Sequence, residues 1–232
     1  MTKINVTKLT AVTSSPKSGG SDTDRLVDEL RRRIVTNQMP PGSRIRENEL
    51  SEEFGVSRSR VRDAFGILEE RGLIERIPNK GAVVMRLEAD SFLELFDVRE
   101  VLEGLMVRLA TQNTEPEYWD DLINLFGADL EKAVENNDFN AYMAAIAQFR
   151  QTCIEATGSG TLRGLLDDIY DRVLSMTRRL MLVPGRASEG FRQHQGILRA
   201  MQEGDAEKAE RLKRENIRSA RQWFLKYNDF LL

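Results

Sequence analysis

Three arginines stand at alternate positions, Arg58, Arg60 and Arg62, in the segment SRSRVRDAF of residues 57–65. On a helix, Arg58 and Arg62 are four residues apart and share a face, whereas Arg60 points away from both. A guanidinium can bind guanine O6 and N7 together, and its charge displaces counterions from phosphate. The segment is therefore a candidate for binding nucleic acid, with a solvated, charged helix start as the alternative.

The residues before this segment predict two helices that would position it. Apolar residues recur at helical spacing from Asp24, and the prolines and glycine of NQMPPGSRI end that first helix. A short second helix is expected over about 47–54, followed by a turn at Gly55. Ser57 is a plausible N-cap of a third helix, which carries the arginines and ends near Gly72.

The residues after the third helix predict a β-hairpin. The runs LIERI and AVVMRL are separated by the turn PNKG, with Lys80 and Gly81 at the tip. Three helices followed by a hairpin make a winged helix-turn-helix, in which the N-terminal end of the third helix enters the major groove. We therefore expect a DNA-binding domain over residues 22–87, after a mobile tail over residues 1–21 that is rich in Ser, Thr, Gly and Lys.

Residues 88–232 are expected to form a second domain that is entirely helical. Polar and glycine-rich breaks divide this region into six segments with apolar stripes, and no strand pattern is evident. The fold class is therefore mainly α: the winged helix-turn-helix, then an all-α bundle of six or seven helices.

Charge and composition support this division. Residues 22–87 carry 13 basic and 12 acidic side chains, whereas residues 88–232 carry 18 basic and 25 acidic ones. Such asymmetry is expected when one part of a chain meets phosphate. No apolar run approaches the ~18 residues that span a bilayer, so we expect a cytoplasmic protein without membrane contact. Cys153 is the only cysteine, which excludes an internal disulfide.

Residues 24–87 resemble the GntR family of bacterial transcriptional regulators. The resemblance rests on MPPGSRIRENELSEEFGVSRSRVRDAFGILEERGLIERIPNKGAVV. It implies that Arg58 and Arg62 contact DNA in the major groove, supported by Ser57 and Ser59, and that Gly81 approaches the minor groove.

Two positions depart from the family pattern. Asn48 stands where many relatives have an arginine, and Arg60 stands where the family usually has proline. We expect Arg60 to contact phosphate, with plain solvent exposure as the alternative. The expected DNA-binding residues are Asn48, Ser57, Arg58, Ser59, Arg60, Arg62, Lys80 and Gly81.

Residues 88 to about 228 resemble the helical effector domain of FadR-type regulators, called FCD. The resemblance rests on LFDVREVLEGLMVRLA, FRQTCIEATGSGTL, HQGILRAMQEGDAEKAERL and ENIRSA. In most of that family an aspartate and three histidines hold a divalent metal. The matching positions here are Ile146, Arg150, His194 and Asn216, of which only His194 is a good ligand. We therefore expect no metal and no other cofactor.

The resemblance implies that this bundle senses a small organic acid, a sugar acid or an acyl compound. We expect Arg150 to bind such an anion in place of the metal, because guanidinium binds carboxylate strongly. Arg99, His194 and Asn216 would help, and Ile146 lines the same site. The alternative for Arg150 is an internal salt bridge with an acid on a neighbouring helix.

The resulting prediction is a ligand-responsive repressor that binds a palindromic operator as a homodimer. One alternative is an architectural DNA-binding protein without an effector. The other is an enzyme that uses the carboxylates of LLDDIYDRV, but no catalytic motif accompanies them.

Overall fold

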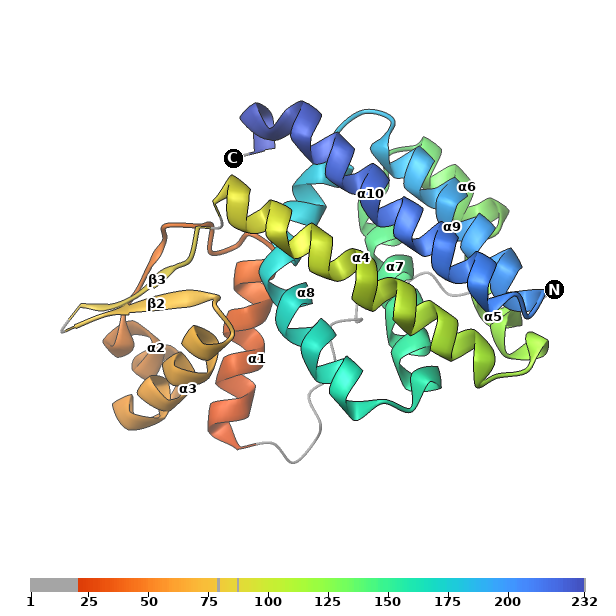
Figure 1. Cartoon of the computed structure of the whole chain (residues 1–232). Helices are drawn as coiled ribbons and strands as arrows, with labels where there is room; N and C mark the ends of the chain where they lie inside the picture. The colour runs from red at the N-terminus through yellow and green to blue at the C-terminus, as the bar shows by residue number, and fades with distance from the viewer. Residues whose placement is uncertain (1–20, 79, 87, 232) are drawn as a thin grey trace. The chain divides into compact units, whose positions relative to one another are not determined.

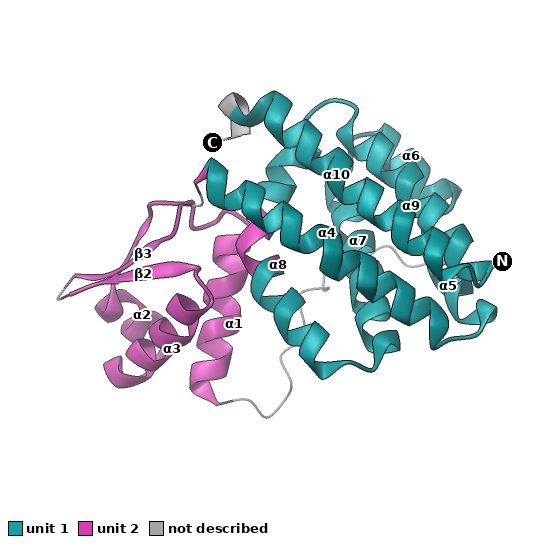
Figure 2. Cartoon of the chain, viewed as in Figure 1, with its two compact units in different colours: residues 1–12, 89–169, 176–232 teal, residues 13–88, 170–175 magenta. Residues whose placement is uncertain are grey.

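The computed structural model describes residues 21–78, 80–86 and 88–231 (Figure 1). The chain divides into two compact units (Figure 2). Of the described residues, 21–78, 80–86, 88 and 170–175 form the first, which we call the N-terminal unit; 89–169 and 176–231 form the second, the helical unit. Apart from Ser21, the tail expected over residues 1–21 lies outside the described residues.

Described residues 21–78 of the N-terminal unit form three helices, as expected. They are α1 (Asp22–Val35), α2 (Glu47–Phe54) and α3 (Arg58–Glu70). Helix α1 begins two residues earlier than the pattern indicated, because Ser21 and Asp24 form a reciprocal capping box at its start. Gly55 ends α2 in the left-handed conformation, with a φ of 64°.

A small antiparallel sheet completes this unit, with strand order β1-β3-β2. The hairpin of β2 (Ile74–Ile77) and β3 (Gly81–Val84) confirms the predicted wing. The additional strand β1 (Arg44–Ile45) pairs with β3. Its two residues are too few for an alternating pattern, which is why the sequence did not indicate it. Apolar side chains from α1, α2, α3 and the sheet form one buried cluster.

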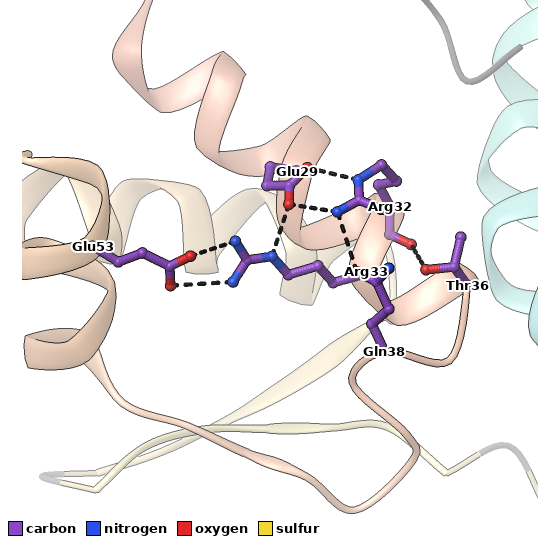
Figure 3. A network of polar contacts seen from close by, with 6 residues as sticks. All are labelled: Glu29, Arg32, Arg33, Thr36, Gln38 and Glu53. Atoms are coloured by element: carbon purple, nitrogen blue, oxygen red, sulfur yellow. Dashed lines mark hydrogen bonds and ion pairs between the residues drawn. The ribbon is translucent and has the colours of Figure 1, made fainter. Parts of the chain in front are cut away.

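Charged side chains also link α1 to α2 (Figure 3). The carboxylate of Glu29 accepts hydrogen bonds from Arg32 and Arg33, and Arg33 is also ion-paired with Glu53 on α2. The hydrogen bond from Arg32 lowers the pKa of Glu29 to about 2. This network holds the position of α2, the helix that precedes the turn into α3.

Described residues 89–231 form seven α-helices. They are α4 (Ala89–Gln112), α5 (Asp120–Leu125), α6 (Ala128–Glu135), α7 (Phe139–Thr157), α8 (Gly160–Met181), α9 (Arg186–Gln202) and α10 (Ala206–Leu231). All of them belong to the helical unit, apart from residues 170–175 of α8. A 3₁₀ turn, η2 (Pro116–Trp119), precedes α5. The structure confirms an all-α bundle, although a break at Gly127 divides one expected segment into α5 and α6.

Two aromatic clusters form much of the core of the helical unit. Phe92 and Phe96 of α4 pack against Phe224 of α10. The rings of Phe126, Tyr142 and Phe149 pack against His194 of α9, and Phe191 packs against Phe126 and Tyr142. No helix among the described residues is both long and apolar enough to cross a membrane.

Candidate functional site

Helix α3 presents its first turn to solvent. Ser57 caps the helix, its hydroxyl accepting a hydrogen bond from the backbone N–H of Arg60 at 3.5 Å and lying 2.8 Å from the Ser59 hydroxyl. Arg58, Ser59, Arg60 and Arg62 are exposed, whereas the apolar positions of α3 are buried. The unpaired N–H groups of a helix start also favour an anion such as phosphate.

The α3 arginines differ in their partners. Arg62 donates from Nε to Glu47 at 2.9 Å, and Arg60 lies 3.6 Å from Asp22. Arg58 has no ion pair among the residues that the structure describes. Ion pairs this exposed contribute little, so another anion can displace them. The first turn of α3 therefore offers guanidinium groups that phosphates or base edges can bind.

The remaining predicted DNA-binding residues lie on α2 and the wing. Asn48 is exposed in the first turn of α2, and Lys80 is exposed beside β3. Gly81 has a φ of 90°, and a Cβ there would lie 2.2 Å from the carbonyl oxygen of Ile45. A structural requirement thus explains Gly81: only glycine allows the start of β3 to lie this close to β1.

A buried carboxylate joins two helices of the helical unit. Glu103 on α4 accepts a hydrogen bond from Arg99 Nε at 2.7 Å and forms an ion pair with Lys213 Nζ of α10 at 2.9 Å. Burial by itself would raise the pKa of Glu103, but the charges of Arg99 and Lys213 lower it to about 2. Lys213 also donates to Asn216 Oδ1 at 3.3 Å. Glu103 is therefore ionised and shared by two cations.

His194 lies beside this group and is buried. Its Nδ1 lies 2.8 Å from the carbonyl oxygen of Gly190 and 3.1 Å from the Tyr142 hydroxyl. Burial, followed by the charge of Lys213, lowers the pKa of His194 to about 3, so the ring is neutral at neutral pH. A carbonyl oxygen can only accept, so the proton is on Nδ1 and Nε2 is an acceptor. Nε2 is buried and has no hydrogen-bond partner among the described residues.

Arg186, the first residue of α9, is also buried, with only 3% of its surface exposed. Its Nε and Nη1 have no hydrogen-bond partner among the described residues, and burial lowers its pKa. Gly190 makes room for it: a Cβ there would lie 3.0 Å from Arg186 Nη1 and 2.8 Å from the Tyr142 hydroxyl. Arg186 and His194 thus lie on one face of α9, each about one turn from Gly190.

We use the name cationic centre for Arg99, Glu103, Arg186, His194, Lys213 and Asn216. Three of the five predicted effector residues belong to it, namely Arg99, His194 and Asn216. Lys213, which stands among other charged residues, and Arg186 were not predicted, because no pattern in the sequence distinguishes them.

The other two predicted effector residues lie on α7. Arg150 is ion-paired with Asp167 of α8, which is the internal salt bridge considered as the alternative. Ile146 is half-buried and offers no polar atom. That Arg150 binds an effector stays a prediction.

The cationic centre does not suit a divalent metal. Both oxygens of Glu103 already accept from cations, and His194 is the only other strong ligand there. No group of three His, Cys, Asp or Glu side chains that could hold a metal is found within the described part of the chain.

Comparison with known proteins decides the family. The profile of the FCD domain matches residues 94–219, more than half of the chain, and that of bacterial regulatory proteins of the gntR family matches residues 22–84. The chain belongs to the GntR family. It is a transcriptional regulator with an N-terminal helix-turn-helix domain and a C-terminal FCD domain.

Two curated relatives of this GntR regulator are similar over most of their length, and a third over a shorter stretch. An uncharacterized HTH-type transcriptional regulator, YdhC of Bacillus subtilis, is 28% identical over 78% of this chain and 81% of its own. A probable D-xylose utilization operon transcriptional repressor of Paenarthrobacter nicotinovorans is 26% identical over 76% and 77%. The gluconate operon transcriptional repressor of Bacillus subtilis is 41% identical, but only over 40% of this chain and 38% of its own.

Solved structures share the fold. The Escherichia coli protein McbR/YncC matches with a TM-score of 0.76 at 21% identity, covering 90% of this chain and all of its own. A GntR-type regulator from Rhodococcus matches with a TM-score of 0.70 at 24% identity, covering 89% of this chain and 99% of its own. At these identities the likeness concerns the fold alone.

Proposed function

We propose that this GntR regulator is a repressor that binds a palindromic operator as a homodimer and loses DNA affinity when a small anionic effector binds its helical unit. The observation that carries the proposal is the buried, cation-rich centre in a protein whose other unit is a DNA-binding domain. A buried cation is costly unless an anion compensates it, so such a centre is suited to an anionic ligand.

The exposed first turn of α3 supports the DNA-binding part. Arg58 and Arg62 share its face, and their side chains are free of the hydrophobic core. Two half-sites on one face of DNA require two such helices, which is the reason for proposing a homodimer. Two relatives are named as operon transcriptional repressors, which supports repression over activation.

DNA binding is tested first, by selecting sites from a random pool of duplexes with the full-length protein. We expect the selected sites to be palindromic. Arg58→Ala and Arg62→Ala should each weaken binding to the selected site by about 1–3 kcal/mol, the value of a bidentate arginine–guanine contact. Arg211→Ala, which removes an exposed arginine of the helical unit, is the matched control. Equal affinities of all three variants would contradict the assignment.

Effector sensing is tested with a panel of organic acids added to the protein–DNA complex. We expect at least one acid to release DNA from the wild-type protein. If no acid of the panel changes DNA affinity, the proposal of a sensor is wrong, and the alternative of an architectural DNA-binding protein without an effector is favoured. Catalysis would instead appear as consumption of an acid.

A further inference from the structure

The cationic centre contains more positive than negative charge. Arg99, Lys213 and Arg186 are buried cations, and Glu103 is the one carboxylate hydrogen-bonded or ion-paired to any of them among the described residues. Glu189 also acts electrostatically on Arg186, but it is half-buried and its carboxylate accepts from three other side chains. Three cations and one carboxylate leave two positive charges, which a ligand with two negative charges would balance.

The unpartnered atoms of the centre define what else a ligand must offer. Arg186 Nε and Nη1 are hydrogen-bond donors without a partner among the described residues, and an anionic acceptor would satisfy them. His194 Nε2 is an acceptor, so it calls for a hydroxyl or amine donor. The ammonium of Lys213 has three N–H groups, of which Glu103 and Asn216 take two. Buried polar groups in proteins are almost always paired, and one ligand that pairs with all of these atoms would account for them.

These groups are near one another. Gly190 connects Arg186 to His194, since its carbonyl oxygen accepts from His194 and its Cα faces Arg186 Nη1. Phe149 connects His194 to Lys213: its ring lies 5.2 Å from the His194 ring and 5.5 Å from Lys213 Nζ. Arg186 and Lys213 both act electrostatically on His194. One small molecule can therefore reach both cations and the imidazole.

We propose that the helical unit binds a small hydroxydicarboxylate through Arg186, His194 and Lys213. Arg186 donates to one carboxylate, Lys213 donates to the other, and His194 Nε2 accepts a hydrogen bond from the hydroxyl. The inference rests on the proposed effector-binding function and adds to it the class of ligand and the residues that select it.

Malate, succinate and lactate are matched probes, to be compared by isothermal titration calorimetry on the full-length protein. Succinate lacks the hydroxyl of malate, and lactate lacks the second carboxylate. We expect malate to bind more tightly than either, by roughly 10-fold or more for each missing group. Equal affinity of malate and succinate, or of malate and lactate, would overturn the proposal.

Arg186→Met tests the anchor with a second readout. The variant should bind malate at least roughly 30-fold more weakly, because one partner of a buried charge pair is lost. It should also melt at a higher temperature than the wild type without ligand, because an unpaired buried charge is removed. A guanidinium with a purely structural role would give a lower melting temperature and unchanged malate affinity, which would refute the assignment.

His194→Gln and Arg150→Gln complete the set. His194→Gln should reduce the preference for malate over succinate and leave succinate binding nearly unchanged. Arg150→Gln tests the competing expectation from the sequence that Arg150 binds the anion; the present proposal expects this variant to bind malate like the wild type, since Arg150 is ion-paired with Asp167 outside the centre. If Arg150→Gln lost malate binding and Arg186→Met kept it, the residue that binds the carboxylate would be Arg150 and not Arg186. If none of the three acids binds, the hydroxydicarboxylate is excluded, whereas the wider panel on the DNA complex still decides whether the protein senses an effector.

Discussion

Replacing Gly81 by alanine should destabilise the wing by two separable effects. Alanine at a φ of 90° carries the cost of a left-handed residue, roughly 1–2 kcal/mol. Its Cβ would also lie 2.2 Å from the Ile45 carbonyl oxygen, so β1 and β3 must separate by about 1 Å, with the loss of sheet hydrogen bonds worth about 1 kcal/mol each. We expect a total of roughly 3–4 kcal/mol.

Gly55→Ala is the matched control for this prediction. Gly55 has a φ of 64°, but nothing lies within 4 Å of a Cβ built there. It should show the conformational cost alone, roughly 1–2 kcal/mol. Urea unfolding of the full chain gives the free energies, and native-state hydrogen exchange at the amides of Ala82 and Val84 gives the local effect. Equal losses in the two variants would refute the role of the Ile45 carbonyl.

Three further predictions concern stability. Gly66→Ala, in the interior of α3 with nothing near the added Cβ, should raise the unfolding free energy by about 0.5–1 kcal/mol in urea titrations. Glu103→Gln should lower it by about 3–5 kcal/mol, because the buried charges of Arg99 and Lys213 lose their shared carboxylate; a loss within 0.5 kcal/mol, roughly that of a surface change, would argue against the pairing. Because the pKa of His194 is about 3 when folded and near 6.5 when unfolded, the unfolded chain binds more protons below pH 6.5; stability should fall from pH 6.5 towards pH 3, and less steeply in His194→Gln.

Local signals in the sequence were sufficient for the N-terminal unit. The cap at Ser57, the turn at Gly55 and the PNKG turn determine α3 and the wing through neighbouring residues, and the structure confirms them. Strand β1 was missed because its pairing with β3 depends on residues some forty positions away. Such long-range pairing leaves no periodic pattern in two residues.

The cationic centre was harder to predict for a related reason. Helical periodicity identifies buried faces but not which buried residues meet across helices. Family positions therefore directed attention to Arg150, whose partner Asp167 lies on the next helix. Lys213 and Arg186 belong to charged segments that are exposed in most proteins, and only the packing of α9 and α10 around His194 brings their charges inside.

The pairing of Arg62 with Glu47 has a consequence for the search along DNA. Under the proposed function, a phosphate that binds Arg62 through Nε must first displace the carboxylate of Glu47, which already accepts from this atom. That exchange reduces the binding free energy that Arg62 contributes on a DNA backbone of arbitrary sequence. A guanine that accepts two hydrogen bonds from Arg62 restores this free energy. Because an exposed ion pair is worth at most about 1 kcal/mol, Glu47 would shorten the residence time on unrelated sequence by a factor of about five at most, and the residence time on the operator by less.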